Sequence, residues 1–473
     1  MTRMLKSLCL VAVGVIVGCS SGANDQSGAV ADRAEDAFSA IPDLPHTAAC
    51  ADGVARFHCK ARVRSITMNG KIQPFATVSG LGPADLVSAY KIDTTKNPGA
   101  TIAIVDAFGY PNAASDLATY RSQFGLPACT VASGCLKIVN DAGNTSPLPP
   151  APAAGDDWTV EAALDLDMAS SACPNCKLLL VQATDDIGNS LFTSQQTAAK
   201  LGATVISNSW GGTDPTASAD EQFFQVVGPN VGIFVSSGDS GNTGGSPDYP
   251  STSAFVTGVG GTTLTKTTTT TRGWTEKAWS GAGSSCSDQI AKPSYQTSSA
   301  CARRAASDIS AVADPNTGVA VFNHGPSNNG WIVVGGTSAS SPFVAGVYAL
   351  YGKGAVGPSY SYANTSQFFD VTTGSNGSCT TALCKAGAGW DGPTGNGTPN
   401  GTAFGGGSSG GGDAGAGGPA ACSHAICSTG TNLVSGCDPC ATKICAADSF
   451  CCNSSWDSIC VGEVNSVCKQ TCP

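Results

Sequence analysis

The sequence has few charged residues and no excess of positive charge. Charged residues make up 12% of its 473 residues, with 24 lysines and arginines against 34 aspartates and glutamates, and the formal net charge is −10. A protein that binds nucleic acid through its phosphates normally has a strongly basic surface. The composition therefore argues against such a protein, and no nucleic-acid partner is expected.

Hydrophobic runs long enough to cross a membrane are missing from the sequence. One apolar run, 8–18, follows Arg3 and Lys6 and is shorter than the ~20 residues that a membrane helix needs. It ends at Cys19 and resembles the signal of bacterial lipoproteins, in which such a cysteine becomes the lipidated first residue. We expect residues 1–19 to be the signal peptide of an exported protein, which a lipid on Cys19 attaches to the membrane. The alternative is an ordinary cleaved signal peptide and a secreted product.

The cysteine content indicates an oxidising compartment. Of 22 cysteines, Cys9 and Cys19 fall in the signal peptide, and an even number remains. Ten of these lie before residue 400 in close pairs, which predicts local disulfides without fixing their connectivity. At 173–176 a redox motif or half a zinc site is the alternative, but no second CxxC motif in this region completes a metal site. The pairs are Cys50/Cys59, Cys129/Cys135, Cys173/Cys176, Cys286/Cys301 and Cys379/Cys384.

Apolar strands alternate with helical segments through most of the chain. Because the strands are continuously apolar, both of their faces should be buried, which predicts a parallel, doubly wound α/β sheet flanked by helices. Loops at the carboxyl ends of the strands would then hold the active site. Strands are predicted over 100–106, 177–181, 204–210, 231–236 and 331–334, helices over 82–90, 114–124, 158–172, 190–201, 220–227 and 343–350, and a hairpin over 262–280.

The composition divides the rest of the chain into four parts. Residues 20–80 are polar and irregular and are predicted to form a tether and a short N-terminal segment. The α/β domain spans 81–404, and 405–420 is a Gly-rich flexible linker. The final module, 421–473, holds ten cysteines and is too short to build much core, so disulfides should hold it. Zinc held by the CxxC motif at 437–440 with a histidine is the alternative.

One serine lies where a nucleophile is favoured. Ser338 follows the strand at 331–334 and two glycines, and it precedes the helix at 343–350. It is therefore expected at a helix N-terminus, where free N–H groups and the helix dipole favour developing negative charge. Thr337 is expected to cap this helix through its hydroxyl. An ordinary helix cap without catalytic function is the alternative.

A serine nucleophile needs a base, and histidine is scarce in this chain. The four histidines are His46, His58, His324 and His424, and none opens an apolar helix after a glycine turn. A conventional triad that uses His324 is therefore poorly supported and is kept as an alternative.

Carboxylates are better placed to serve as the base. Glu161 and Asp165 are four residues apart in the apolar helix at 158–172, so they share one face. Adjacent carboxylates raise one pKa and can share a proton, which gives a usable base in acid. Asp239 follows the strand at 231–236 and, if protonated, could donate a hydrogen bond to an oxyanion. A solvated acidic face and a turn aspartate are the alternatives.

Three motifs in this order, Glu161-x-x-x-Asp165, Ser-Gly-Asp239-Ser-Gly and Gly-Gly-Thr-Ser338-Ala-Ser, resemble those of the sedolisin family of serine-carboxyl peptidases. The match covers residues 82–404. The resemblance implies a subtilisin-like fold and a Ser-Glu-Asp triad, with Ser338 as nucleophile, Glu161 as general base and Asp165 orienting Glu161. It also implies Asp239 as oxyanion donor. Two further residues implied in the carboxylate network are Asp106 and Trp210.

The resemblance further implies one structural calcium site near the end of the α/β domain. The loops 369–374 and 386–391 look like the family's pattern, and oxygen ligands on glycine-containing turns suit calcium. Two turn-rich loops with incidental acids are the alternative. The implied ligands are the side chains of Asp370 and Asp391 and the carbonyls of Val371, Gly387 and Gly389.

Family members often carry a long N-terminal prodomain, whereas only residues 20–81 separate this signal peptide from the first motif. The resemblance thus leaves activation open. The leading hypothesis is an exported, monomeric serine endopeptidase that hydrolyses protein or peptide substrates best in acid. The alternative from another class is an inactive protease-like scaffold that binds surface ligands through its Cys-rich tail.

Overall fold

The computed structural model describes residues 44–472 with gaps, and it divides into two compact units after Ser408. The signal peptide, Cys19 and the linker beyond Gly405 lie outside the described residues. Within the described part of the chain, no helix combines the length and apolarity needed to cross a bilayer. The gaps are 52–55, 65–66, 69–70, 73–74, 76, 97, 154, 214–216, 229–230, 243–247, 406–421, 423, 434–437, 449 and 454.

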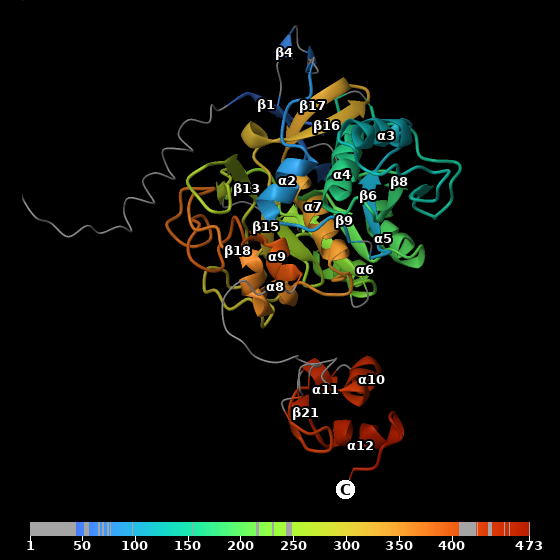
Figure 1. Ribbon diagram of the computed structural model, residues 1–473, viewed down its shortest axis with the longest axis vertical. Helices are drawn as coiled ribbons and strands as arrows, with labels where there is room; N and C mark the ends of the chain where they lie inside the picture. The colour runs from blue at the N-terminus through green and yellow to red at the C-terminus, as the bar shows by residue number, and fades with distance from the viewer. Residues whose placement is uncertain are drawn as a thin grey trace, which may run out of the picture. The chain divides into compact units, whose positions relative to one another are not determined.

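An eight-stranded sheet forms the centre of the first unit (Figure 1). Its strands follow the order β14, β13, β11, β9, β6, β8 and β7, and β15 pairs with β13. All of these pairs are parallel except that of β13 with β14, the predicted hairpin, so the expected parallel sheet is confirmed. The strands are β6 Thr101–Ala107, β7 Leu136–Asn140, β8 Lys177–Ala183, β9 Val205–Asn208, β11 Gly232–Ser236, β13 Thr257–Lys266, β14 Trp274–Ala278 and β15 Ile309–Val312.

Helices cover both faces of this sheet and enclose two apolar cores. Ile102 and Ile104 of β6 pack into the core that includes α4 and α7, whereas Ala103 and Val105 pack into the core that includes α5 and α6. This alternation follows from strand geometry, because successive side chains point to opposite faces. The helices are α2 Pro83–Tyr90, α3 Ala113–Gln123, α4 Trp158–Ala172, α5 Ser190–Lys200, α6 Ala217–Gln225, α7 Thr337–Leu350, α8 Ser359–Ala363, α9 Gly401–Phe404 and the 3-10 turns η1 Pro315–Thr317 and η2 Thr365–Gln367.

The strand order reverses direction beside β6. From β6 the chain first adds β7 and β8 on one side, and it then crosses to add β9, β11 and β13 on the other. The carboxyl ends of β6 and β9 therefore meet where a doubly wound sheet opens a crevice. Asp106 lies at the end of β6, and Ser209 follows the end of β9. Active-site residues are expected at this point.

The segment before residue 81 departs from its prediction as irregular. Its short strands pair with distant parts of the chain: β1 and β3 join β17 and β16 in one sheet, and β2 joins β10 and β12 in another. Strands of two or three residues carry no periodicity, so the sequence could not reveal them. The predicted strand at 204–210 is likewise divided, because Trp210 begins β10. These strands are β1 His46–Ala48, β2 His58–Cys59, β3 Arg62–Arg64, β4 Thr67–Met68, β5 Lys71–Ile72, β10 Trp210–Thr213, β12 Asp248–Tyr249, β16 Val319–His324, β17 Asn329–Gly335, β18 Phe368–Phe369 and β19 Thr398–Pro399.

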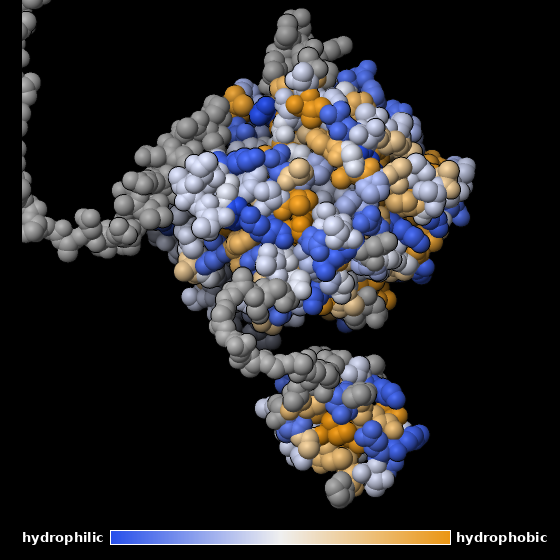
Figure 2. Space-filling view, viewed as in Figure 1, coloured by the Kyte–Doolittle hydropathy of each residue, from blue (hydrophilic) through white to orange (hydrophobic). Residues whose placement is uncertain are grey.

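The surface of the first unit carries no large continuous apolar patch on the face that Figure 2 shows. On the face that Figure 2 shows, hydrophobic residues form small separate areas among hydrophilic ones. The exposed large hydrophobic residues of this unit are scattered along the sequence, at Val131, Leu148, Ile187 and Val226. Single exposed apolar residues of this kind are normal and need no special function.

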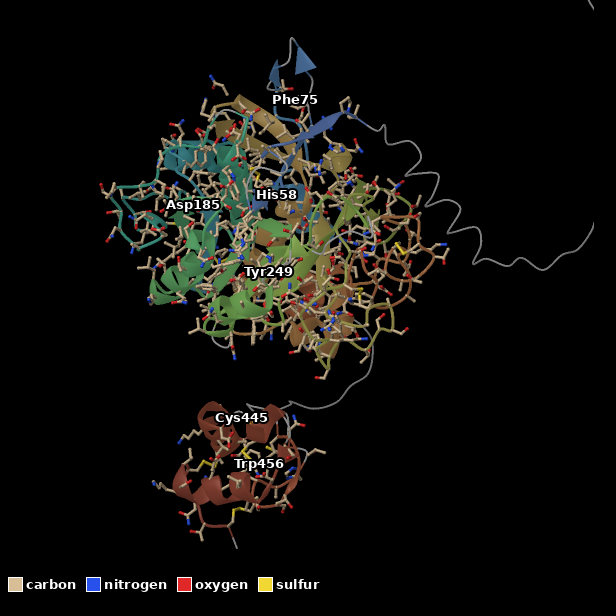
Figure 3. The ribbon with its side chains drawn as sticks, turned by 180° about the vertical axis from the view of Figure 1, so that it is seen from behind. His58, Phe75, Asp185, Tyr249, Cys445 and Trp456 are labelled. Atoms are coloured by element: carbon tan, nitrogen blue, oxygen red, sulfur yellow. A yellow bond between two sulfur atoms is a disulfide. The ribbon has the colours of Figure 1, made fainter. Side chains whose placement is uncertain are left out.

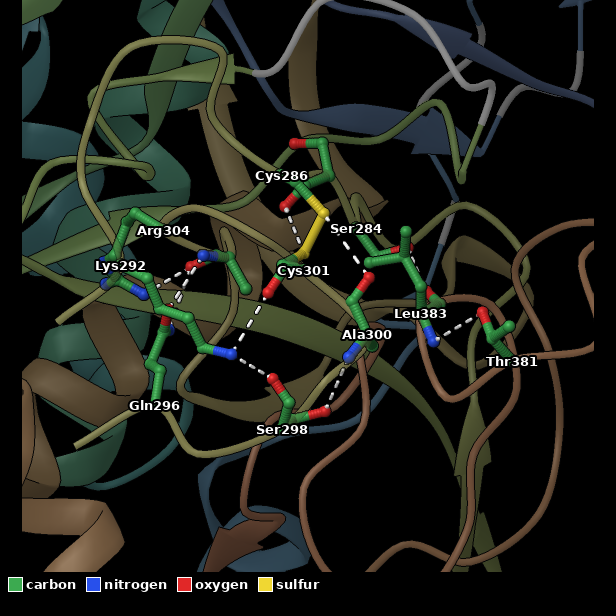
Figure 4. The surroundings of a disulfide bond; sticks show 12 residues. Ser284, Cys286, Lys292, Gln296, Ser298, Ala300, Cys301, Arg304, Thr381 and Leu383 are labelled. Carbon is green, nitrogen blue, oxygen red and sulfur yellow. Dashed lines mark hydrogen bonds between the residues drawn. A yellow bond between two sulfur atoms is a disulfide. The ribbon is translucent and has the colours of Figure 1, made fainter. Parts of the chain in front are cut away.

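A buried ion pair and a disulfide stabilise the region after β14. Arg304 and Asp308 are fully buried, with Nη2 2.6 Å from Oδ2. Nearby, Lys292 donates a hydrogen bond to the carbonyl of Cys301, whose sulfur is bonded to Cys286 (Figure 4). All five disulfides expected in this unit are present, and the buried Cys173–Cys176 bond leaves no thiolate there for a metal.

The second unit is small and rich in disulfides. Its core gathers Trp456, Leu433, Ile444 and Val464 between short helices (Trp456 and Cys445 are labelled in Figure 3). Cys440 is bonded to Cys468, so the zinc alternative is wrong for this cysteine; Cys437 lies outside the described residues. The elements are β20 Gly430–Thr431, α10 Pro439–Ala447, α11 Phe450–Asn453, β21 Ser455–Trp456 and α12 Ser458–Ser466, and the other bonds are Cys427–Cys472, Cys445–Cys452 and Cys451–Cys460.

Candidate active site

Ser338 lies in the first turn of α7, at the centre of the unit. The helix starts at Thr337 and is preceded by Gly336, whose φ of 98° is a conformation that favours glycine. Ser338 is fully buried, and its hydroxyl donates a hydrogen bond to the carbonyl of Ser209 at 3.4 Å. The predicted position at a helix N-terminus, among free N–H groups, is therefore correct.

Thr337 does not cap α7, contrary to the prediction. No side chain caps this helix at Gly336. Instead the Thr337 hydroxyl and its backbone N–H both donate to Oδ1 of Asp239, at 2.9 and 2.7 Å. The hydroxyl also accepts a hydrogen bond from the N–H of Gly238 at 3.1 Å. Thr337 thus fixes the loop that carries Asp239 beside Ser338, which a local capping rule could not indicate.

Helix α4 brings two carboxyl groups to the same place. Every residue of α4 is buried, and the helix packs directly against α7. Gly346 permits this close packing, because a Cβ there would lie 2.6 Å from the Cβ of Ala172. Glu161 and Asp165 lie one turn apart on α4, so their side chains leave the helix on one face. The predicted pair is therefore inside the protein and not on a solvated face.

Hydrogen bonds satisfy one oxygen of each carboxyl group. Oε2 of Glu161 accepts from the N–H of Ala61 at 2.7 Å, and Oδ1 of Asp165 accepts from the hydroxyl of Ser209 at 2.8 Å. The remaining atoms, Oε1 of Glu161 and Oδ2 of Asp165, are buried without a hydrogen-bond partner among the described residues. Burying such atoms costs free energy unless a proton or a donor is supplied. A proton held between the two carboxyl groups would satisfy both.

The protonation of these acids is strongly displaced from that of free side chains. Burial raises the pKa of Glu161 well above its ordinary value, the charge of Asp106 raises it further, and contact with the Ser338 hydroxyl lowers it. Burial and the charges of Asp106 and Glu161 raise the pKa of Asp165 in the same way. Burial raises the pKa of Asp106 itself to about 8. The three acids form one group that holds protons well into the neutral range, which we call the carboxyl cluster.

Asp239 approaches the site from the end of β11. Burial raises the pKa of Asp239 to about 6, although Arg62 and the Thr337 hydrogen bonds oppose the rise. Its Oδ2 atom lies 3.5 Å from Nε of Arg62 and has no hydrogen-bond partner among the described residues. A Cβ placed on Gly336 would lie 2.7 Å from this atom. The unpartnered oxygen of Asp239 therefore borders the turn that carries Ser338.

Other predicted residues lie differently. Trp210 is buried and donates from its indole nitrogen to the carbonyl of Val105, next to Asp106, so it supports the end of β6. His324 pairs with Asp116, with Nδ1 2.9 Å from Oδ1. Among the described residues, the hydroxyl of Ser338 donates its hydrogen bond to the carbonyl of Ser209. The geometry gives no support to a triad based on His324.

Sequence reasoning missed the N-terminal contribution to the site. Lys60 and Ala61 lie among the active-site residues: the N–H of Lys60 donates to the carbonyl of Ser209 at 3.0 Å, and that of Ala61 to Glu161. No local pattern marks this segment, because its partners lie far along the chain. Ser209 was also missed, and its place after the apolar strand β9 was the only signal available.

The two loops proposed for calcium lie together. The N–H of Gly389 donates to Oδ2 of Asp370 at 2.9 Å, and the N–H of Gly387 donates to Oδ2 of Asp391 at 3.2 Å. Burial raises the pKa of Asp391 to about 7, and the charge of Asp370 adds to the rise. Val371 follows Asp370 and is buried. The predicted carboxylates are therefore close enough to repel each other.

In the second unit, one group of side chains has metal-ligand types at ligand spacing, Asp448, Cys451 and Glu463. Cys451 is bonded to Cys460 and offers no thiolate. Nothing in this group supports a metal site.

Comparisons with known proteins identify the family. A model of the subtilase family matches residues 153–390, about half of the chain. The chain belongs to the subtilase family. A second model, a domain of unknown function (DUF8252), matches residues 420–472, which is the Cys-rich unit. The subtilisin-like α/β fold predicted from the motifs is thereby confirmed.

The relatives of this subtilase are of the sedolisin type. Kumamolisin from Bacillus sp. (strain MN-32) is 28% identical over 386 residues, which cover 74% of this chain and 67% of the relative. Sedolisin from Pseudomonas sp. (strain 101) is 30% identical over 371 residues, which cover 68% and 60%. The chain thus spans about two thirds of the length of these relatives.

A solved structure gives the same result. Pseudomonas sedolisin, a serine-carboxyl proteinase complexed with two molecules of pseudo-iodotyrostatin, superposes with a TM-score of 0.59 at 25% identity. The match covers 70% of this chain and 98% of that protein. The resemblance to the sedolisin family is therefore confirmed, and the protein is a serine-type peptidase by homology.

Proposed function

We propose that the protein is a serine endopeptidase of the serine-carboxyl type, in which Ser338 is the nucleophile and the carboxyl cluster is its base. The observation that carries the proposal is the burial of Glu161 next to the buried Ser338 hydroxyl, with Oε1 of Glu161 left without a hydrogen-bond partner among the described residues. A buried acid with a raised pKa beside a nucleophile suits general base catalysis in acid.

Glu161 accepts the proton of Ser338 as the hydroxyl attacks a peptide carbonyl. Asp165 orients Glu161 and shares the proton, because the facing oxygens of the two groups lack other donors. The hydroxyl of Ser209 fixes Asp165, and Asp106 raises the proton affinity of both acids. Glu161 then returns the proton to the leaving nitrogen.

Asp239 supplies the oxyanion donor. Its pKa of about 6 means that the side chain is mostly protonated in acid and mostly ionised near neutrality. A protonated Oδ2 can donate to the negative charge on the tetrahedral intermediate, whereas an ionised one repels that charge. The proposed peptidase therefore works best below pH 6.

The test is the variant Ser338→Ala, assayed on an unfolded protein substrate from pH 3 to pH 8. We expect a loss of about 10⁴-fold or more in kcat/KM in acid, since removal of a triad member has effects of this size. Ser341→Ala, on the same helix and outside the proposed machinery, is the matched control. Equal cleavage by Ser338→Ala and the parent enzyme would refute the proposal, and a rate peak near pH 7.5 that disappears in His324→Ala would favour the histidine alternative.

The inactive-scaffold alternative is tested separately. A fluorophosphonate probe should label Ser338 in the parent protein at acidic pH. If no pH gives labelling while the protein remains folded, the binding-scaffold function is favoured.

We also propose one structural calcium ion at the loops 369–374 and 386–391. All of the expected donors are oxygens, which suits calcium, and a divalent cation would offset the repulsion between Asp370 and Asp391. The residues that would hold the ion are Asp370, Val371, Gly387, Gly389 and Asp391. The bound ion would stabilise the loops and takes no part in the reaction.

The proposed setting is extracytoplasmic. At least nine disulfides link described cysteines, and such bonds persist in oxidising compartments. Together with the lipoprotein-type signal, this supports an exported protein attached to the envelope through a lipid on Cys19, and the signal alone also allows a secreted form.

A further inference from the structure

Residues 56–64 cross the active site as an extended peptide does when it binds a sheet edge. Strand β2 pairs antiparallel with β10, with Cys59 opposite Trp210 and His58 opposite Gly211. Further along, β3 pairs antiparallel with β17. Strands β2 and β12 flank β10 on its two sides. Figure 3 labels one residue of each, His58 of β2 and Tyr249 of β12. Such pairing uses main-chain hydrogen bonds for affinity and leaves side chains for specificity.

The peptide bond between Lys60 and Ala61 lies at the catalytic groups. The N–H of Lys60 and the hydroxyl of Ser338 both donate to the carbonyl of Ser209. The N–H of Ala61 donates to Glu161 at 2.7 Å, which is the group that would protonate a leaving nitrogen. This bond therefore occupies the position of a scissile bond.

The carbonyl oxygen of Lys60 lies on the oxyanion side of the site. A Cβ added to Gly336 would be 1.9 Å from this oxygen and 2.7 Å from Oδ2 of Asp239. The two oxygens therefore border the same small space. A hydrogen bond from protonated Asp239 to a developing oxyanion on Lys60 would be formed there.

The side chain of Lys60 enters a pocket with an acid at its end. Its Nζ lies 3.1 and 3.0 Å from the two carboxylate oxygens of Asp248, and 2.8 Å from Nε2 of His58. Only 4% of the lysine side chain is exposed. A buried ammonium is stable only when paired, so Asp248 is what permits a cation here.

Two glycines, Gly211 and Gly238, leave room for the side chains of Lys60 and Asp248. A Cβ at Gly211 would lie 3.4 Å from Cε of Lys60, and one at Gly238 would lie 2.2 Å from Oδ2 of Asp248. A side chain at Gly238 would displace the acid, whereas a Cβ at Gly211 would only touch the lysine side chain. Asp248 is held in place by β12, where it pairs with Thr213 of β10. The pocket is thus built on the strand that binds the peptide.

We propose that this pocket is the subsite for the residue immediately before the scissile bond, that it selects lysine or arginine, and that Asp248 determines this specificity. The proposal rests on the endopeptidase function proposed above and adds a substrate class to it. A carboxylate can accept hydrogen bonds either from the ammonium of lysine or from two N–H groups of an arginine guanidinium. Neutral side chains would leave Asp248 partly buried without its partner.

Cleavage at Lys60–Ala61 follows the same chemistry. Ser338 Oγ gives its proton to Glu161 and bonds to the Lys60 carbonyl carbon; the bond to the Ala61 nitrogen then breaks as that nitrogen takes the proton. Water next hydrolyses the ester, which leaves a carboxylate on Lys60 and a free Ser338 hydroxyl. Cys50 and Cys59 are bonded to each other and both precede the cut, so their bond does not join the products.

The experiment compares four peptides that differ only before the scissile bond, with lysine, arginine, norleucine or glutamate. The full chain and the variant Asp248→Asn are assayed at pH 5, with Asp288→Asn, an exposed aspartate, as the matched control. We expect kcat/KM for lysine and arginine to exceed that for norleucine by about 100-fold or more in the parent and the control. In Asp248→Asn this ratio should fall below about 10-fold, mainly through slower cleavage of the lysine and arginine peptides.

The outcomes separate the subsite from the enzyme. Equal cleavage of all four peptides, or a preference unchanged in Asp248→Asn, overturns the subsite and leaves the peptidase function intact. If no peptide is cleaved but a fluorophosphonate labels Ser338, the N-terminal residue of the purified protein is determined instead. A new start at Ala61 in the parent and not in Asp248→Asn supports the subsite, and its absence from both overturns it. If the protein neither cleaves a peptide nor is labelled by the probe, both the proposed function and the proposed subsite are refuted.

Discussion

Two sets of buried acids in the same unit have opposite surroundings. Asp308 faces the guanidinium of Arg304, with additional hydrogen bonds from the N–H of Gly258 and the hydroxyl of Tyr362. The carboxyl cluster of Asp106, Glu161 and Asp165 contains no cation: both oxygens of Asp106 and one oxygen of each other acid lack a partner among the described residues. Both sets are almost completely excluded from solvent.

The difference separates structural from chemical use of a buried acid. A carboxylate whose oxygens all meet donors and a cation is fixed in one charge state and contributes to a unique fold. Acids that face one another hold protons with raised affinity and are ready to exchange them. The protein therefore gives Asp308 a paired cation and gives none to Glu161.

The largest expected effects come from replacing one acid of each set, in turn, by the corresponding amide. Glu161→Gln keeps the shape and the acceptor for Ala61 but cannot take a proton. We expect kcat/KM in acid to fall about 10⁴-fold. The unfolding free energy at pH 5, measured with urea, should change by less than about 1 kcal/mol, because glutamine keeps the acceptor for Ala61 and introduces no charge.

Asp308→Asn is the reciprocal variant. It leaves Arg304 buried without its carboxylate, so the unfolding free energy should fall by about 3–5 kcal/mol. Activity per folded molecule should stay near that of the parent. If Asp308→Asn lowered activity as much as Glu161→Gln, or Glu161→Gln destabilised the fold as much as Asp308→Asn, the comparison would be wrong.

The pH dependence of stability sharpens the comparison. The pKa of Asp106 is about 8 in the folded protein and near 4 in an unfolded chain, and those of Glu161 and Asp165 are also raised. Between these values the folded state binds more protons, so the unfolding free energy should fall as pH rises from about 4 to 8. Each such group contributes a slope of about 1.4 kcal/mol per pH unit.

Urea unfolding at intervals across this range measures the slope. Asp106→Asn should flatten it by removing one of the groups. A slope that is unchanged in Asp106→Asn, or a parent whose stability rises with pH over this range, contradicts the assignment of raised pKa values to the carboxyl cluster.

The smallest effect concerns a third arrangement, in which a metal ion would take the place of the arginine. If calcium binds between Asp370 and Asp391, a chelator should lower the midpoint of thermal unfolding by about 5 °C. In Asp391→Asn the midpoint should be lower from the start and insensitive to the chelator. Asp288→Asn, which removes an exposed acid, should respond to the chelator as the parent does. Equal midpoints with and without chelator in the parent would exclude the site.

Much of the fold could be predicted because its signals are local. Helix α4 begins and ends at the residues predicted, and β6, β8, β9 and β11 lie within a few residues of their predicted bounds. Strands β7 and β15 were not predicted, and the strand predicted at 331–334 is β17, which pairs antiparallel in another sheet. Apolar periodicity carries this information in each segment by itself. The five disulfides before residue 400 also pair residues that are near in sequence, and their prediction was correct.

The errors share one cause, which is dependence on distant partners. Thr337 binds Asp239 instead of capping its own helix, and Trp210 leaves the strand β9 to pair with His58–Cys59. The strands β2 and β3 are only two or three residues long and exist through their pairing with β10 and β17. No window of the sequence contains both halves of these interactions.

The sequence by itself determined the parts of the proposed active site. The order of the motifs around Glu161, Asp239 and Ser338 predicted a serine-carboxyl peptidase through its resemblance to the sedolisin family. Tertiary structure alone decided what surrounds those parts. Burial and mutual proximity set the proton affinity of the carboxyl cluster, and the path of residues 56–64 placed Lys60 against Asp248, which lies far along the chain.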